Sequence, residues 1–176
     1  MPFLSTMTIG LVSGTLLTTE IESTGPIVDS FELQRLQNEF PGVGTWNAPD
    51  GRLNRIFGRP METGSSPRET AMKVVREWSG IWGLAPKNLM LAGPFPGDDR
   101  TEQTLMWDQG TETYKFTAVY FKQNVQGVPV YNSRLQVLVR NDSGYPAVSI
   151  GTDLRNVEAL AGASRPVGIE RSMVDA

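Results

Sequence analysis

The side chains best suited to chemistry in this sequence are carboxylates in a loop rich in proline and glycine. Asp98, Asp99 and Glu102 lie close together there, and their oxygens are the ligands that a hard cation such as calcium prefers. The Asp-x-Asp-x-Asp-Gly spacing of a calcium loop is absent, and no distant partner residue is identifiable. We therefore interpret the segment as a solvated acidic loop and predict no metal site and no cofactor.

Two residue types are missing altogether, because the chain of 176 residues has no His and no Cys. Without them there is no imidazole base near neutral pH, no Ser–His or Cys–His nucleophile pair and no Cys/His zinc site. Disulfide frameworks are excluded as well. We predict no catalytic residue. A small carboxylate-based hydrolase is the third and weakest alternative for the function.

Composition and charge limit the kinds of partner that the chain is expected to bind. The net charge of −3 comes without clusters of basic residues, so no nucleic-acid partner is expected. The apolar segment 9–17 is interrupted by glycine and serine, and the first basic residue is Arg35, which argues against a cleaved signal peptide. No run approaches the ~20 apolar residues of a membrane span, so no membrane partner is expected.

The clearest helix signal covers residues 67–82. Ser66 is placed as the N-cap, Pro67 as the first helical residue and Glu69 as the second half of a capping box, while Gly83 or Gly80 can end the helix. Apolar residues recur at helical spacing, which predicts one buried stripe packed against a sheet: Ala71, Val74, Val75, Trp78 and Trp82.

Shorter elements are expected on both sides of this helix. The segment 29–40 predicts a helix capped by Asp29, and 44–58 predicts a hairpin. Residues 84–112 are expected to be mostly loop, with a short strand at 105–107. Further along, the sequence predicts three strands, at 113–125, 131–140 and 145–150.

The second of these strands alternates between apolar and polar residues, with Tyr131, Leu135, Val137 and Val139 on one face. Asn132, Arg134, Gln136 and Arg140 lie on the other face, which should therefore be wet and which only Leu138 interrupts. The predicted fold class is α+β, an antiparallel sheet packed against one main amphipathic helix.

The segment QNVQGVPV joins the first two of these strands. Gly127 fits a turn position with positive φ, and Pro129 lacks an N–H and suits a strand edge. The Gln123 amide can satisfy loose backbone groups. These structural roles are favoured over a role in binding, although Gln123, Gly127, Val128, Pro129 and Val130 are also the candidates for contact with a partner.

The order of these elements resembles the fungalysin/thermolysin propeptide (FTP) domain, which is related to PepSY domains, over residues 44–160. The most specific part is VYFKQNVQGVPVYNSRLQVLVRNDSGYPAVSIG, residues 119–151. Two departures from the family pattern are Lys122 before the glutamine and the longer turn Asp142-Ser143-Gly144.

The resemblance implies a non-catalytic domain from the pro-region of a secreted zinc metallopeptidase, acting as intramolecular chaperone and inhibitor of a peptidase domain in the same polypeptide. It also implies a secreted or cell-surface location. The alternative is a structural or adhesive module of an exported multidomain protein that uses the same fold without a peptidase. An H-E-x-x-H helix further along the native polypeptide would distinguish the two.

The expected organisation is an arm over 1–43 with a possible short helix, the FTP-like domain over 44–160, and a segment 161–176 that follows it. The last segment reads as a linker rich in small residues and the first turns of a further, PepSY-type domain. A helix this short is marginal in water on its own, so amide exchange should show little protection over 169–176.

Overall fold

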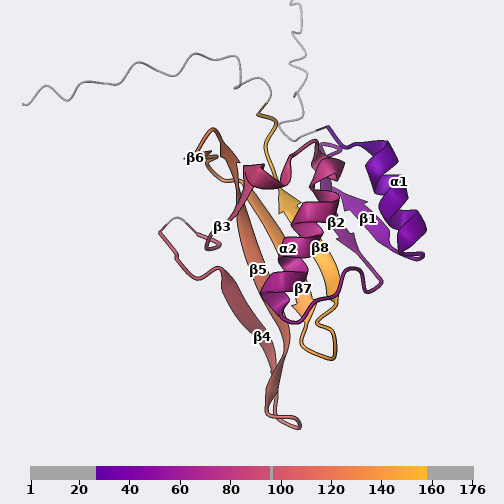
Figure 1. The fold of residues 1–176 in the computed structure, drawn as a ribbon, viewed down its shortest axis with the longest axis vertical. Helices are drawn as coiled ribbons and strands as arrows, with labels where there is room; N and C mark the ends of the chain where they lie inside the picture. Colours follow the sequence, from indigo (N-terminus) through magenta and orange to yellow (C-terminus); the bar gives the residue numbers. More distant parts are fainter. Residues whose placement is uncertain (1–26, 96, 158–176) are drawn as a thin grey trace, which may run out of the picture.

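The computed structural model describes residues 27–95 and 97–157 (Figure 1). Predictions for residues 1–26 and 161–176 lie outside the described residues. The helices are α1 (Ser30–Glu39), α2 (Pro67–Trp78) and the short 3-10 helices η1 (Ser79–Trp82) and η2 (Pro86–Asn88). The strands are β1 (Gly44–Asn47), β2 (Leu53–Phe57), β3 (Leu89–Leu91), β4 (Glu102–Asp108), β5 (Thr113–Val125), β6 (Val128–Pro129), β7 (Arg134–Arg140) and β8 (Ala147–Asp153).

The eight strands of the described residues belong to one sheet. Six of them follow one another in the order β1-β2-β8-β7-β5-β3, and β4 and β6 pair with β5 outside this order. β3 and β4 both pair with β5 along its outer side, β3 with residues 121–123 and β4 with residues 113–119. The short strand β6 pairs with the end of β5. All these pairings are antiparallel, so β5 is the strand around which the sheet is organised.

The predicted fold class, a sheet packed against one main amphipathic helix, is wrong. Over the described residues the structure is mostly antiparallel sheet, with eight strands and two short α-helices. The hairpin β1–β2 does not stand apart, because β2 pairs with β8 and extends the sheet. The region expected to be mostly loop supplies β3 and also β4, which contains and extends the short strand predicted at 105–107. Short strands of this kind carry little local signal, because β5 supplies their hydrogen-bond partners from far along the chain.

Helix α2 has the predicted cap. The Ser66 hydroxyl accepts the Glu69 N–H at 3.2 Å, and Pro67 is the first helical residue. The α-helix ends at Trp78 and continues as η1, which Gly83 ends in the left-handed region at φ 62°. The predicted apolar stripe is confirmed as buried, and α2 packs on β5, β7 and β8.

The capping box differs from the prediction, because the Glu69 carboxylate reaches one residue further back than expected. It accepts the Ser65 N–H at 2.8 Å and the Ser65 hydroxyl. These hydrogen bonds stabilise the charged form and lower the pKa of Glu69 below its ordinary value.

The Glu69→Gln variant should therefore be less resistant to urea than the wild type at pH 7. The folded pKa lies below the unfolded value of 4.5, so the stabilisation is present above pH 4.5 and is lost as the pH falls through the folded pKa. The difference in urea midpoint should shrink over that range. Glu39→Gln, at the exposed end of α1, is the matched control for the change in charge and should keep the urea midpoint of the wild type at pH 7. A difference that persists below the folded pKa would contradict the assignment.

Helix α1 belongs to the same core as α2. Asp29 caps it by accepting N–H groups from Phe31 at 2.9 Å and Glu32 at 3.2 Å. Leu36 is fully buried, and the Asp29 N–H donates to the Ile81 carbonyl at 2.8 Å. Helix α1 therefore packs against the segment that follows α2.

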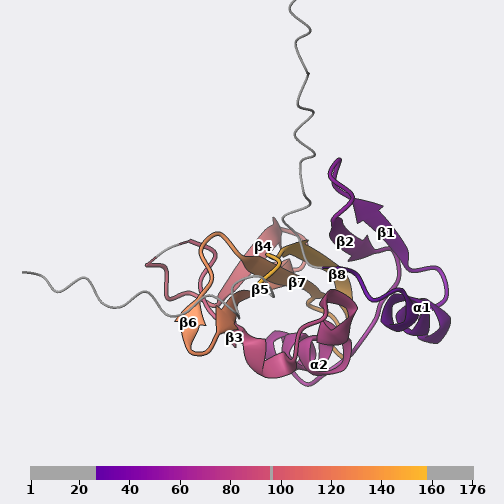
Figure 2. The same ribbon diagram turned by 90° about the horizontal axis from the view of Figure 1, so that it is seen from above.

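Both helices lie on the same side of the curved sheet (Figure 2). The core between them and the sheet is formed by apolar side chains from every layer, including Leu36, Ile56, Val74, Trp78, Trp82, Val119, Phe121, Leu135, Val137 and Ile150. No helix covers the opposite face in the part of the chain that the structure describes. That uncovered side of β1, β2, β8, β7, β5 and β4 is called the open face below.

Two predicted strands begin later than expected. β7 starts at Arg134, because Asn132 adopts φ 50° and Tyr131 is 79% exposed in the preceding turn. β8 starts at Ala147 after Tyr145, whose φ is 42°. Tyr131 therefore does not join the apolar face on which the alternation placed it. Left-handed backbone at Asn132 and Tyr145 interrupts the extended conformation there, although the hydropathy pattern continues.

Candidate binding surface on the open face

The alternation of buried and more exposed side chains along β7 shows which residues lie on the open face. Leu135, Val137 and Val139 are fully buried toward the helices, so the neighbouring side chains point to the other side. The predicted wet face of this strand is thus confirmed for Arg134, Gln136 and Arg140, with Leu138 between them. Strand register then identifies the residues that share this face on the neighbouring strands.

One row of directly paired residues crosses five strands of the open face. It runs from Trp46 on β1 to Arg55 on β2, Gly151 on β8, Gln136 on β7 and Tyr120 on β5. A second row runs parallel to it and contains Phe57, Ser149, Leu138, Ala118 and Gln103. The face is therefore a regular lattice of side chains assembled from distant parts of the chain.

Large aromatic side chains are exposed on this lattice. Trp46 and Trp107 are each 53% exposed, and Phe57 and Tyr114 are each 42% exposed. The Trp107 and Tyr114 rings pack edge to face with centroids 5.0 Å apart. Aromatic residues are enriched at protein–protein interfaces, where they supply large contact areas. Their concentration on one uncovered face indicates a binding surface.

The charges on the open face are mostly positive. Arg55 and Arg134 are exposed, and their side chains form no hydrogen bond or ion pair within the described residues. Arg140 pairs with Asp142 in the following turn. Among the paired strand residues of this face, Asp153 is the one anion, and it already binds Arg52 at 3.1 Å. The face therefore carries uncompensated positive charge in a chain whose net charge is −3.

Tyr120 on β5 is the last residue of the first row, next to Gln136 on β7. Its hydroxyl donates to Gln103 Oε1 at 2.9 Å, and its side chain is largely buried by its neighbours. Burial raises the pKa of the Tyr120 phenol, against the opposing effect of Arg134. The phenol is therefore neutral near neutral pH and acts as a hydrogen-bonded wall of the face.

Gln123, the first of the predicted motif residues, is used inside the chain. It is fully buried, its Nε2 donates to the Arg155 carbonyl at 2.9 Å, and its Oε1 accepts the Arg155 N–H at 3.0 Å. Its own N–H donates to the Ser133 hydroxyl at 3.0 Å, and that hydroxyl donates to the Val130 carbonyl at 2.9 Å. Gln123 therefore ties the hairpin to the segment that follows β8.

The other motif residues form the hairpin tip. Gln126 and Gly127 have φ values of 51° and 86°, so both central residues of this two-residue turn are left-handed, as in a type I′ turn. The predicted positive φ of Gly127 is confirmed. Val128 and Pro129 are exposed and pair with the end of β5. The structure thus separates a buried anchor from an exposed tip, and contact between the tip and a partner stays a prediction.

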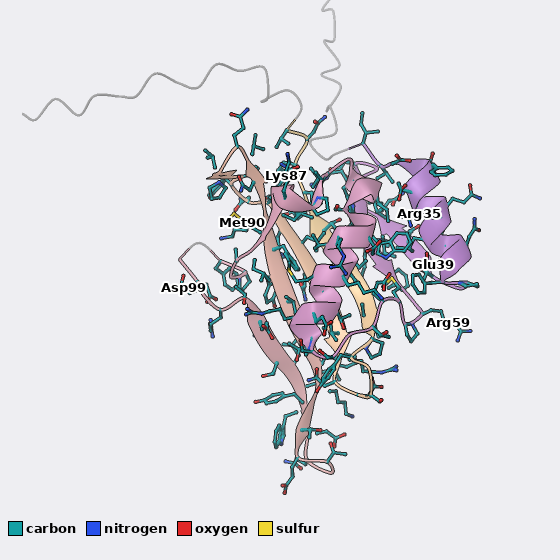
Figure 3. All side chains as sticks on the ribbon, in the orientation of Figure 1. Arg35, Glu39, Arg59, Lys87, Met90 and Asp99 are labelled. Atoms are coloured by element: carbon teal, nitrogen blue, oxygen red, sulfur yellow. The ribbon has the colours of Figure 1, made fainter. Side chains whose placement is uncertain are left out.

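The acidic loop does not gather its carboxylates. Asp98 binds the Arg100 guanidinium at 3.0 Å, which lowers the pKa of Asp98, and Glu102 binds Arg68 at 2.7 Å. Asp99 points outward from the loop (Figure 3). Within the described ranges, no group of three or more acidic, His or Cys side chains could hold a metal ion.

Comparison with known proteins identifies no relative, since no protein-family profile, curated protein or solved structure matches this chain. Over the residues described, no helix has the length and apolar character needed to cross a membrane.

Most of the open face was not predicted from the sequence. The alternation of 134–140 indicated one wet strand face, but Trp46, Arg55 and Gly151 carry no local signal for their place beside it. Only the pairing of β2 with β8, about a hundred positions apart in the chain, brings them there.

Proposed function

We propose that this chain is a non-catalytic, propeptide-type module that binds a secreted zinc metallopeptidase in the same polypeptide, assists its folding and inhibits it. The observation that supports this function best is the open face, a broad uncovered sheet surface with exposed aromatic and arginine side chains. Tryptophan, tyrosine and arginine are the residue types that most often dominate the binding energy of protein interfaces.

The rest of the molecule suits a binding module. The sequence contains no imidazole or thiol side chain, and Asp98 and Glu102 of the acidic loop each bind an arginine. A sheet with helices on one side presents a rigid surface whose side chains are fixed by strand register. Such a surface can bind a partner with little ordering cost.

The proposal is tested by titrating the purified chain into thermolysin-like and fungalysin-like zinc peptidases during peptide hydrolysis. We expect saturable inhibition of at least one of them, no inhibition of a serine peptidase, and an increased yield when the sensitive peptidase is refolded with the chain. The chain alone should hydrolyse no casein, with or without added zinc.

Absence of inhibition in both peptidase classes, and of any effect on refolding, would overturn the proposed function. Hydrolysis that copurifies with the chain and resists chelators would contradict its non-catalytic character. Inhibition of the serine peptidase to the same extent would show that the effect is unspecific.

A further inference from the structure

We infer that the open face binds an acidic polypeptide surface, and that the hollow over Gly151 beside Arg55 receives one of its carboxylate side chains. The inference deepens the proposed function and rests on it only for the identity of the partner as a peptidase. The site lies in the row formed by Trp46, Arg55, Gly151, Gln136 and Tyr120.

Gly151 leaves a gap in the middle of this row. A Cβ placed on Gly151 would meet no other atom within 4 Å, so the space above its backbone is open. Its direct neighbours across the sheet are Arg55 on β2 and Gln136 on β7, about 5 Å away on either side. A side chain from outside can therefore reach the sheet backbone at this point, between the strands that carry Arg55 and Gln136.

The chemistry around the gap favours a carboxylate. Arg55 is exposed and engages no acidic group of the described chain, and its guanidinium offers paired donors that match a carboxylate. The Gln136 amide adds a further donor. Arg134 lies two residues from Gln136 on the same face. Its direct neighbour on β8 is Asp153, whose carboxylate is already bound by Arg52 and Arg155.

The surroundings favour a polypeptide over a nucleic acid. Trp46 lies beyond Arg55 in the row and Phe57 lies diagonally across from Gly151. Both expose apolar surface, which suits aliphatic and aromatic side chains. The face carries a few arginines and one carboxylate, with acidic groups elsewhere on a chain of net charge −3. A phosphate backbone needs many more neutralising contacts than this.

The test uses Trp fluorescence to follow binding of a random copolymer of glutamate and tyrosine at low and high salt. We expect saturable binding that weakens with salt. Arg55→Glu should weaken it about tenfold, as expected when an attractive charge contact becomes repulsive. Gly151→Leu should weaken it similarly by filling the hollow without changing charge, and Gly151 has no left-handed φ that would strain the substitution.

Arg59→Glu and Lys87→Glu are the matched controls. Both residues are exposed cations that lie off the open face, Arg59 in the loop after β2 and Lys87 in η2 (Figure 3). Each control makes the same change in net charge as Arg55→Glu and should alter binding less than twofold. Circular dichroism and urea midpoints show which variants keep the fold. If Gly151→Leu does not fold, the inference is tested by comparing copolymer binding of Arg55→Glu with that of the two controls.

Equal weakening by Arg55→Glu and by the controls would overturn the inference, because net charge would then explain binding. Tighter binding of oligothymidylate than of the copolymer would overturn it in favour of a nucleic acid. A concentration-dependent dimer dissociated by Arg55→Glu would overturn it in favour of a second copy of the chain.

Failure of this inference is distinguishable from failure of the proposed function. Peptidase inhibition that Arg55→Glu and Gly151→Leu leave unchanged would overturn the inference while the proposed function stands. Copolymer binding that depends on Arg55 and Gly151, without inhibition of any peptidase, would support the inference and overturn the peptidase as partner.

Discussion

Replacing Trp78 by alanine is expected to lower the free energy of unfolding by about 3–5 kcal/mol. Trp78 is 1% exposed, and its ring packs edge to face on Phe40 with centroids 6.0 Å apart. The Arg35 guanidinium lies 4.2 Å from the ring centre, and Nε1 donates to Glu62 at 3.1 Å. The side chain thus joins both helices to the segment before α2, and its loss leaves a large cavity.

Chemical denaturation measures this effect, with Trp46→Ala as the matched control. Trp46 lies on the open face and is 53% exposed, so its removal should change the free energy of unfolding by no more than about 0.5 kcal/mol. A loss well below 1 kcal/mol in Trp78→Ala would contradict the packing of α2 on the sheet. Trp78→Phe should lower the free energy of unfolding by an intermediate amount. It loses the hydrogen bond from Nε1 to Glu62, but Glu62 keeps its ion pair with Lys73 Nζ at 2.6 Å.

Replacing Gln123 by methionine should cost about 2–4 kcal/mol of stability. The side chain keeps its size, but the Arg155 N–H and carbonyl lose their partners at 3.0 Å and 2.9 Å. Each unsatisfied buried polar group costs about 1–3 kcal/mol. The large effect thus comes from the two stranded backbone groups.

Gln136→Met is the control for this substitution. Gln136 lies on the open face and is only partly buried, so urea denaturation should show a change within about 0.5 kcal/mol. Equal stability of Gln123→Met and the wild type would contradict the anchoring role. A loss of partner binding without a loss of stability would instead place Gln123 among the contact residues.

The sequence by itself determined the elements whose signals are local. Ser66, Pro67 and Gly83 mark the ends of the helical segment, and the buried stripe follows from its spacing. The type I′ turn at Gly127 is local too, since positive φ is a property of one or two residues. The missing His and Cys also limit chemistry without any knowledge of the fold.

Tertiary structure alone decided the fold class and the open face. The hairpin 44–58 was predicted, but its pairing with β8 is a choice of register between distant segments. β3 and most of β4 lie in a segment expected to be loop, because their hydrogen-bond partners come from β5 and not from neighbouring residues. The same long-range pairing places Arg55 beside Gly151 and Gln136. Strand pairing depends on partners remote in sequence, whereas caps and turns depend on neighbours, and this difference separates what the sequence predicts from what only the folded chain shows.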